Sequence, residues 1–333
     1  MNGSINNRSI NHHHIGDGKA SFHLKLVLFL AFVCAGVLAS AAQPTKQVSI
    51  IKSSEAAVYD TVIEVLDQQL QRPCNAQEHS CLRVETHSFT AGEAPFPNPS
   101  DDLVLTLGLK AREYADQYLG NSRIINAMIP TANGQLSESA INSLKHPTLL
   151  LDQPPIRSLL LIKFLIPTAE RIGLLISRDD TKRMASLVRA ADKLDLQLVI
   201  RIVDNEDNLG KQLATMLDEI DVLLALPDNK IHNRHNVSSI LLTTYRNRIP
   251  LIGFSAAYVK AGALAAVYST PENIGDQLAD LIVQVFTSQG PEKRVIYPNY
   301  FSVSINSRVA RSLGIQLQLD SDKLEQLIRD AEQ

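Results

Sequence analysis

The chain has 333 residues, of which 45% are hydrophobic and 20% charged, and its formal net charge is -3. These values are typical of a globular protein, exclude a disordered or fibrous chain, and argue against a basic nucleic-acid-binding surface. The absence of tryptophan and an aromatic content of 5% also disfavour surfaces that bind sugars or single strands by ring stacking. A chain of this length is typical of two domains.

The first 42 residues have the pattern of a secretory signal peptide. Residues 1–25 are polar and mainly basic in charge, residues 26–37 are almost wholly apolar, and small residues follow at 39–42. Because the apolar run is shorter than the roughly 20 residues that span a membrane, we expect cleavage after Ala41 or Ala42. Val33 precedes Cys34, where a lipoprotein signal has a small residue, so lipid attachment is not expected. The mature chain would carry a net charge of -5.

Two cysteines, Cys74 and Cys81, remain after this cleavage. In an oxidising compartment, two thiols so close in the sequence and flanked by turn-forming residues predict one disulfide. A metal site that combines the two thiolates with His79 is the alternative, although this spacing matches no familiar zinc pattern.

From Gln47 onward, short apolar runs alternate with longer stretches of helical period, which is typical of a doubly wound α/β sheet. The expected strands in the first half are residues 48–52, 82–87, 103–107, 124–129 and 148–151, and the expected helices are 55–71 and the segment from Gly108 to Tyr118. Strands as apolar as these are buried on both faces. A parallel sheet covered by helices is therefore predicted.

The same alternation starts again in the second half of the chain. The expected strands are 172–176, 196–203, 222–226, 251–254 and 264–268, and the expected helices are 181–194, 209–220, 237–246 and a helix opened by Thr270-Pro271. Pro154 and Pro155 mark the junction, since two prolines neither continue a strand nor lie deep inside a helix. The prediction is two Rossmann-like α/β lobes joined by a hinge: 45–154 with about 265–290, and 155–264 with about 291–333.

One segment approximates a catalytic motif. Gly253-Phe254-Ser255-Ala256-Ala257 is similar to the nucleophile elbow of α/β-hydrolases. In that fold the histidine follows the serine, but no histidine follows His235 in this chain. A serine hydrolase that uses Ser255 with His232 or His235 is therefore an alternative hypothesis, and the simpler interpretation is that Ser255 caps the next helix.

His232 and His235 are three residues apart and lie near Asp228, which is the minimum for a metal site on one helix face. Their neighbours in the sequence are polar, which favours a surface turn instead. The sequence has no Walker loop, no G-x-G-x-x-G after the first strand and no H-E-x-x-H motif. We therefore expect no metal, no cofactor and no catalytic residues.

Polar residues recur where the predicted strands end, and open α/β sheets bind their ligands at this edge. In the first lobe, hydroxyl groups and a glycine are suited to holding a carboxylate at a helix start, namely at Ser53, Ser54, Thr106, Gly108 and Thr131. In the second lobe, we expect Asp228 to pair with a ligand ammonium. Phe254 and Tyr268 would cover the apolar part of the ligand, and Asn229 and Ser255 complete the predicted site. The sequence thus predicts a small molecule held between the lobes without covalent change.

Four segments of the second half carry a resemblance to a known family: 220–229 (IDVLLALPDN), 249–253 (IPLIG), 261–265 (AGALA) and 304–315 (SINSRVARSLGI). They resemble the ABC-transporter substrate-binding proteins that include tryptophan- and tyrosine-binding members, where the first segment reads V-D-x-x-x-x-P-T-D-N and the last I-N-x-x-x-A-x-x-L-G-I. The resemblance implies the type I periplasmic-binding-protein fold. It also implies capture of a small organic solute, such as an amino-acid-like molecule, in the periplasm.

The partners that the resemblance implies are an ABC permease and its ATPase, with the binding protein itself a monomer. An extracytoplasmic sensor that presents its ligand-bound form to a membrane sensor kinase would have the same fold, and it is the alternative hypothesis. A cytoplasmic repressor on a related fold is disfavoured, because a signal peptide stands in place of an N-terminal helix-turn-helix. No nucleic-acid partner is expected.

Overall fold

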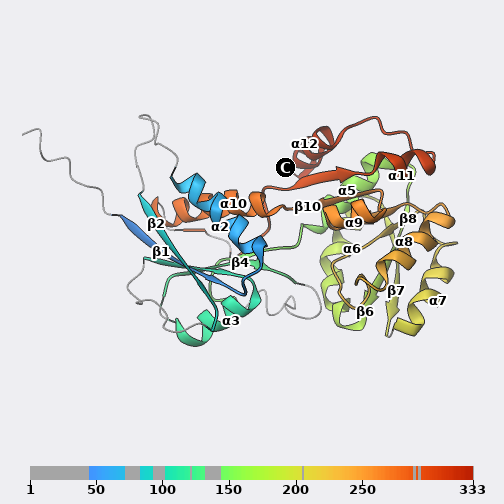
Figure 1. The fold of residues 1–333 in the computed structure, drawn as a ribbon. Helices are drawn as coiled ribbons and strands as arrows, with labels where there is room; N and C mark the ends of the chain where they lie inside the picture. Colours follow the sequence, from blue (N-terminus) through green and yellow to red (C-terminus); the bar gives the residue numbers. More distant parts are fainter. Residues whose placement is uncertain are drawn as a thin grey trace, which may run out of the picture. The chain divides into compact units, whose positions relative to one another are not determined.

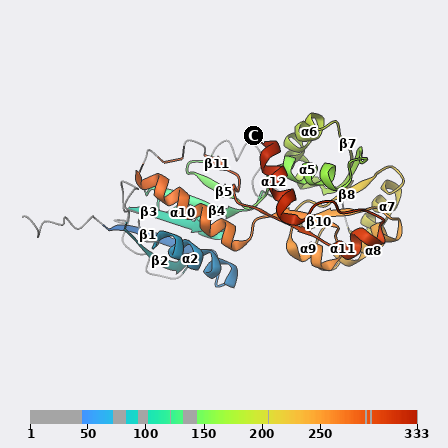
Figure 2. The same ribbon diagram turned by 90° about the horizontal axis from the view of Figure 1, so that it is seen from above.

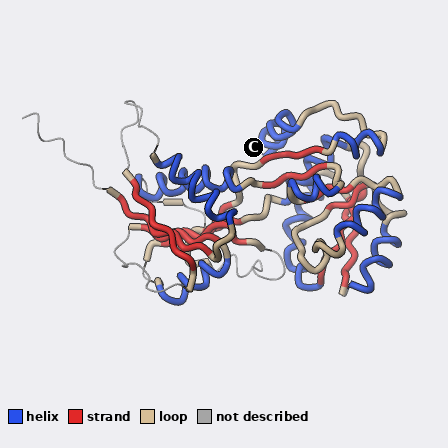
Figure 3. Tube along the Cα trace, viewed as in Figure 1, coloured by secondary structure: helices blue, strands red, loops and turns tan. Residues whose placement is uncertain are grey.

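The computed structural model describes residues 45–71, 83–92, 102–120, 122–131, 144–204, 206–287, 290–291 and 294–332. The strands within these ranges form two six-stranded sheets (Figure 3). The expected signal peptide, and Cys74 and Cys81 with their predicted disulfide, lie outside the described residues. Within the described ranges, no helix combines the length and the apolar character that crossing a membrane requires.

The first sheet is built mainly from the first half of the chain. Its strands are β1 (Lys46–Lys52), β2 (Val84–Thr90), β3 (Leu103–Leu107), β4 (Ile124–Ile129), β5 (Thr148–Leu150) and β11 (Val295–Ile296). They are all parallel and follow the order β11-β5-β4-β3-β1-β2. The central strands β3 and β4 are buried throughout, as their continuous apolar runs predict, whereas the edge strand β2 is half exposed.

Helices cover both faces of this sheet. α2 (Ala57–Leu70) and α10 (Pro271–Thr287) lie side by side on one face, and α3 (Leu109–Tyr118) lies on the other (Figures 1 and 2). Gly275 allows the close approach of α10 to α2, because a Cβ at this position would lie 2.9 Å from the carbonyl oxygen of Val62. A segment more than 200 residues later in the sequence thus completes the core of the first lobe.

The second sheet has the order β12-β10-β9-β8-β6-β7, and every neighbouring pair is parallel except the antiparallel pair of β12 and β10. Its strands are β6 (Arg171–Ser177), β7 (Gln197–Val203), β8 (Val222–Leu224), β9 (Leu251–Gly253), β10 (Ala265–Tyr268) and β12 (Ser302–Ile305). Apolar residues of three helices pack on one face, namely α5 (Pro155–Leu165), α6 (Met184–Lys193) and α12 (Ser321–Glu332). On the other face lie α7 (Glu206–Met216), α8 (Val237–Arg246) and α9 (Ala256–Ala261), while α11 (Ser307–Ser312) follows β12.

The predicted fold class of two α/β lobes with mostly parallel strands is confirmed. The sequence interpretation did not include helix α5, because six of its eleven residues are buried and its apolar run has no polar face to reveal a helical period. The expected helix at 181–194 begins instead as the 3-10 turn Arg178–Arg183 and becomes α-helical at Met184.

Two late segments differ from the expected lobe boundaries. The segment 265–290 was expected in the first lobe, but its first part, β10, pairs within the second sheet. Its second part, α10, packs on α2 of the first lobe. β11 pairs with β5 of the first sheet although 291–333 was expected in the second lobe. The reason is that the chain passes from one sheet to the other three times, at residues 151–154, 269–270 and 297–301.

Candidate functional site

A pocket of about 720 Å³ lies at the carboxyl ends of strands from both sheets. Its wall is formed by residues that follow β4, β5, β8, β9 and β10, together with parts of α5 and α6 and residues at β11. This is the edge at which α/β sheets bind ligands, because the helices that follow the strands begin there and their first N–H groups are unpaired. The position of the pocket therefore agrees with the strand-end rule.

Four of the predicted ligand-binding residues line this pocket: Thr131, Phe254, Ser255 and Tyr268. The backbone N–H of Thr131 donates to Asp152 Oδ2 at 2.7 Å, which holds the turn after β4 against the turn after β5. The Ser255 hydroxyl oxygen accepts from the N–H of Tyr258 at 3.2 Å and caps α9, as the sequence predicts. The hydroxyl of Tyr268 lies 2.6 Å from Ser304 Oγ, so that its ring is held in place.

Sequence reasoning missed five further polar residues of the pocket wall: Asp152, Gln153, Ser158, Ser186 and Arg189. Asp152 and Gln153 directly follow β5, so the strand-end rule that selected the other residues also points to them. Ser158 lies on α5, and Ser186 and Arg189 lie on α6, where no local signal marks a binding residue. Much of the remaining wall is apolar and includes Leu151, Met184, Leu187, Leu226, Val267 and Val295. A mainly apolar wall with a few polar groups is typical of small-molecule sites.

Three of the residues predicted in the first lobe lie around the start of α3 or next to it, and the pocket wall does not include them. Ser53 Oγ accepts from the N–H of Ala111 at 3.0 Å, so it satisfies an otherwise unpaired donor in the first turn of α3. Gly108 has a φ of 89°, and a Cβ there would lie 2.6 Å from Ser53 Oγ. Ser54 is exposed. Their roles are those of a turn and a helix cap.

A basic side chain also lies at this strand end. Lys52 is buried, and its Nζ donates to Glu55 at 2.8 Å and to Asp60 at 3.0 Å. The hydrogen bond to Glu55 is the main cause that raises the pKa of Lys52, and burial opposes it. The positive charge is therefore neutralised within the first lobe.

Thr106 belongs to a buried chain of polar side chains that crosses β3, β4 and β5. Its hydroxyl donates to Asn126 Oδ1 at 2.7 Å, and Asn126 Nδ2 donates to Thr148 Oγ1 at 3.3 Å. The Thr148 hydroxyl in turn donates to the carbonyl oxygen of His146 at 3.0 Å. Because Thr106 is fully buried, its hydroxyl connects strands of the core.

Asp228 is also used within the protein. It is 3% exposed, and its carboxylate accepts from the backbone N–H of Ser177 at 2.9 Å and of Lys230 at 3.0 Å. Burial by itself would raise the pKa of Asp228, but the backbone hydrogen bonds from Ser177 and Lys230 hold the pKa below its usual value. The carboxylate thus ties the end of β6 to the loop after β8. The neighbouring Asn229 is exposed, and neither residue is in the pocket wall.

A cluster of aromatic rings supports Phe254 from behind the pocket wall. His232 is buried, its Nδ1 lies 2.9 Å from the Tyr258 hydroxyl, and its ring meets the Phe254 and Tyr258 rings edge-on at 6.0 Å and 5.7 Å between centroids. His235 is exposed, so the two histidines do not converge. Among the residues that the structure describes, no three His, Cys, Asp or Glu side chains are grouped so as to hold a metal ion.

The burial of His232 predicts a pH dependence of stability. Burial lowers the pKa of His232 from 6.5 to about 4, against an opposing effect of the Asp228 carboxylate. Between these two values the unfolded chain binds a proton that the folded chain does not, so stability falls as the pH drops below 6.5. This residue should cost about 2 kcal/mol of unfolding free energy at pH 5 relative to pH 7.5.

Urea unfolding of the wild type and of His232→Gln at both pH values checks this expectation. The substitution removes the titrating group, so the difference between the two pH values should shrink by about the same 2 kcal/mol. An unchanged difference would show that His232 is already protonated in the folded protein.

The arrangement around Ser255 is not that of a hydrolase. The Ser255 hydroxyl caps α9, and His232 Nδ1 pairs with Tyr258. Between described residues, no hydrogen bond links Ser255 to a histidine. A serine nucleophile needs a base within hydrogen-bonding reach.

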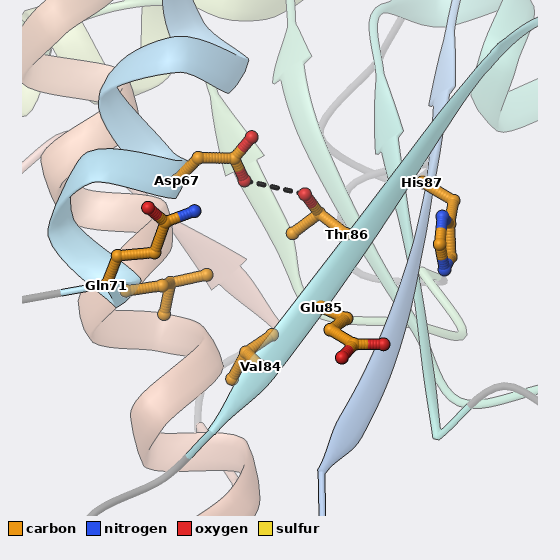
Figure 4. Close-up of a pocket in the computed structure, with 7 residues that line it drawn as sticks. Asp67, Gln71, Val84, Glu85, Thr86 and His87 are labelled. Carbon is orange, nitrogen blue, oxygen red and sulfur yellow. Dashed lines mark hydrogen bonds between the residues drawn. The ribbon is translucent and has the colours of Figure 1, made fainter.

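A second hollow, of about 320 Å³, lies beside the edge strand β2 (Figure 4). Thr86 donates a hydrogen bond to Asp67 of α2 at 2.7 Å, and Figure 4 shows Glu85 and His87 on the opposite side of the strand. Gln47 of β1 bridges Glu85 and His87. Its Nε2 donates to Glu85 at 2.9 Å, and its Oε1 lies 3.2 Å from His87 Nε2. The polar groups of this hollow point to different faces, so they do not form one site.

Comparison with known proteins agrees with the fold. The model of the family described as ABC transporter substrate binding protein matches residues 122–325. No curated protein matches the chain.

Three solved structures illustrate the structural likeness. A ligand-free, open substrate-binding protein with adhesive properties from Clostridium difficile is 15% identical, with a TM-score of 0.63, and the match covers 83% of this chain and 97% of that one. A Streptococcus pneumonia domain in complex with L-Trp is 18% identical, with a TM-score of 0.52 and coverage of 82% and 96%. A conserved domain protein from Vibrio cholerae is 19% identical, with the same TM-score and the same coverage. At such identities the likeness supports the type I binding-protein fold.

The family match spans more than half of the chain and includes the segments whose resemblance the sequence revealed. It also includes all the residues that line the pocket, from Pro130 to Tyr297. The chain belongs to the family of ABC transporter substrate-binding proteins, which bind solutes and are not enzymes.

Proposed function

We propose that the mature chain, beginning at about residue 43, captures a small organic solute in the periplasm and delivers it to an ABC permease driven by its ATPase. The observation that carries this proposal is the pocket of about 720 Å³ at the carboxyl ends of strands from both sheets. A site built from two lobes is suited to a receptor that closes on its ligand, since each lobe supplies only part of the binding free energy. The family match supports the same role.

The proposed contacts are those that line the pocket. Phe254 and Tyr268 would cover the apolar body of the solute, and Thr131 and Ser255 would contact its polar groups. Gln153 and Ser158 add an amide and a hydroxyl to this set. Asp228 is left out of the proposed ligand contacts, because the pocket wall does not include it and its oxygens already accept backbone hydrogen bonds. The proposed solute is therefore a largely apolar molecule with a few hydrogen-bonding groups, and the protein would act as a monomer.

A thermal-shift screen of the mature chain tests the proposal. Amino acids, nucleosides and organic acids are the probes, with L-Trp first because a structural neighbour holds it. A solute that binds only the folded state raises the unfolding midpoint, and about 100-fold excess over Kd adds about 2.7 kcal/mol. The variant Ser158→Phe, which fills the pocket from α5, should abolish the rise for any solute that produces it.

The matched control is Ser238→Phe, the same substitution at an exposed position on α8. It should leave the ligand-induced rise unchanged. A solute that stabilises Ser158→Phe as strongly as the wild type would show that binding occurs outside this pocket. For the delivery step, cells that lack the protein should lose uptake of the same solute; unaltered uptake would contradict the role in transport.

A further inference from the structure

Three segments connect the two sheets, and we call them the crossover segments. The first, 151–154, leads from β5 to α5; the second, 269–270, leads from β10 to α10; and the third, 297–301, leads from β11 to β12. A change in the relative position of two lobes is absorbed by the backbone of such connections. Any bond between these segments therefore bears on how the lobes move.

Gln153 links all three crossover segments through a chain of directed hydrogen bonds. Its Nε2 donates to Ser269 Oγ at 2.8 Å, and the Ser269 hydroxyl donates to the carbonyl oxygen of Tyr300 at 2.7 Å. Its Oε1 accepts from Arg157 Nη1 at 2.8 Å. Since a guanidinium only donates and a carbonyl oxygen only accepts, each bond in this chain has one possible direction.

Arg157 anchors this chain at its donor end. It is 5% exposed, its Nη1 also donates to the carbonyl oxygen of Pro298 at 2.6 Å, and its Nε donates to Glu332 at 2.8 Å. Its guanidinium lies 4.1 Å from the centre of the Phe301 ring, and Arg329 lies 4.4 Å from the same centre. The C-terminal helix α12 thereby holds the residue that orients Gln153.

The same network reaches the pocket. Gln153 and Ser269 are part of the pocket wall, and Tyr297 of the third crossover segment lines it too. A solute that touches the Gln153 amide or the Ser269 hydroxyl thus contacts the bonds that join the crossover segments.

We propose that Gln153 is the positioning residue of the hinge: with Ser269 and the Arg157–Glu332 pair, it couples the three crossover segments to one another and to occupancy of the pocket. Removing its amide breaks the link between the first and second crossover segments and leaves Ser269 Oγ without its donor and Arg157 without one of its acceptors, so the segments open more readily. Hydrogen exchange reports such local opening. In Gln153→Ala, we expect the amides of 269–270 and of 299–301 to exchange at least tenfold faster than in the wild type, while β3 and β8 are unchanged.

Hydrogen–deuterium exchange of the ligand-free mature chain, read by mass spectrometry, tests this proposal. The matched control is Gln326→Ala on α12, where the exposed amide pairs only with Asp330 in the next turn. This control should leave the crossover segments as in the wild type. Ser269→Ala should reproduce the faster exchange of 269–270, and Ser269→Thr, which keeps the hydroxyl, should restore the wild-type rate.

Three results would overturn the proposal. One is faster exchange confined to residues 151–154, which would show that the segments are not coupled. Another is faster exchange to the same extent in β3 and β8, which would indicate a loss of global stability. The third is a failure of Ser269→Thr to restore the rate. The measurement uses no ligand, so its result is independent of the solute screen and of the proposed transport function.

Discussion

Replacing Arg157 with alanine is expected to lower the free energy of unfolding by about 4 kcal/mol, because breaking a buried ion pair leaves its partners without compensation. The guanidinium is buried and donates to Glu332, Gln153 and the carbonyl oxygen of Pro298. Burial lowers the pKa of Arg157, and the hydrogen bond that Arg157 donates to Glu332 opposes this effect. The substitution also uncovers one face of the buried Phe301 ring.

Urea unfolding followed by circular dichroism at pH 7 measures this change. Arg157→Lys keeps the charge but cannot reproduce the forked geometry, so an intermediate loss is expected. The control is Arg178→Ala, which breaks the exposed pair of Arg178 with Asp204 and should cost less than about 1 kcal/mol. A loss for Arg157→Ala as small as that of the control would mean that the network does not contribute to stability.

Asp228→Ala is expected to lower the free energy of unfolding by about 3 kcal/mol. The substitution leaves the backbone N–H groups of Ser177 and Lys230 without their acceptor, and an unpaired buried donor costs about 1–3 kcal/mol. Asp228→Asn keeps one carbonyl oxygen and should lose about half as much. Both variants are measured by urea unfolding at pH 7.

The pH dependence of this effect has a definite sign. Because the folded protein holds the pKa of Asp228 below 3.8, its carboxylate contributes stability above that pH, and the contribution is lost as the pH falls further. The advantage of the wild type over Asp228→Asn should therefore shrink below pH 4. If Asp228→Ala unfolds like the wild type but loses the shift produced by an ammonium-bearing solute, Asp228 binds the ligand as the sequence predicted.

Local sequence patterns identified most of the strands that surround the pocket, β11 excepted, but not which strand-end residues face it. Thr131, Phe254, Ser255 and Tyr268 line the pocket, while Ser53 caps α3 and Thr106 joins a buried polar chain. All six follow or end apolar runs in the same way. A hydroxyl group hydrogen-bonds to a ligand or to the protein according to what lies within about 3 Å of it, and neighbours in space are not visible in the sequence.

The residues that sequence reasoning missed have the same explanation. Helix α5 lies in an apolar run that is buried on most sides, so its period was hidden, and Arg157 and Ser158 were hidden with it. Gln153 directly follows β5, so the strand-end rule could have marked it, but its bond to Ser269 joins positions 116 residues apart, and the bond between Arg157 and Glu332 joins positions 175 residues apart. Contacts of this separation leave no local pattern.

The sequence alone determined the alternation of strands and helices, the two-lobed fold class and the resemblance to a solute-binding family, because hydrophobic periodicity and turn residues act over short stretches of chain. Only the tertiary structure decided which polar residues bond to the protein and which line the pocket, and how the crossover segments are tied together. The physical reason is that hydrogen bonds and burial depend on distances between segments, which are set only when the sheets and helices pack.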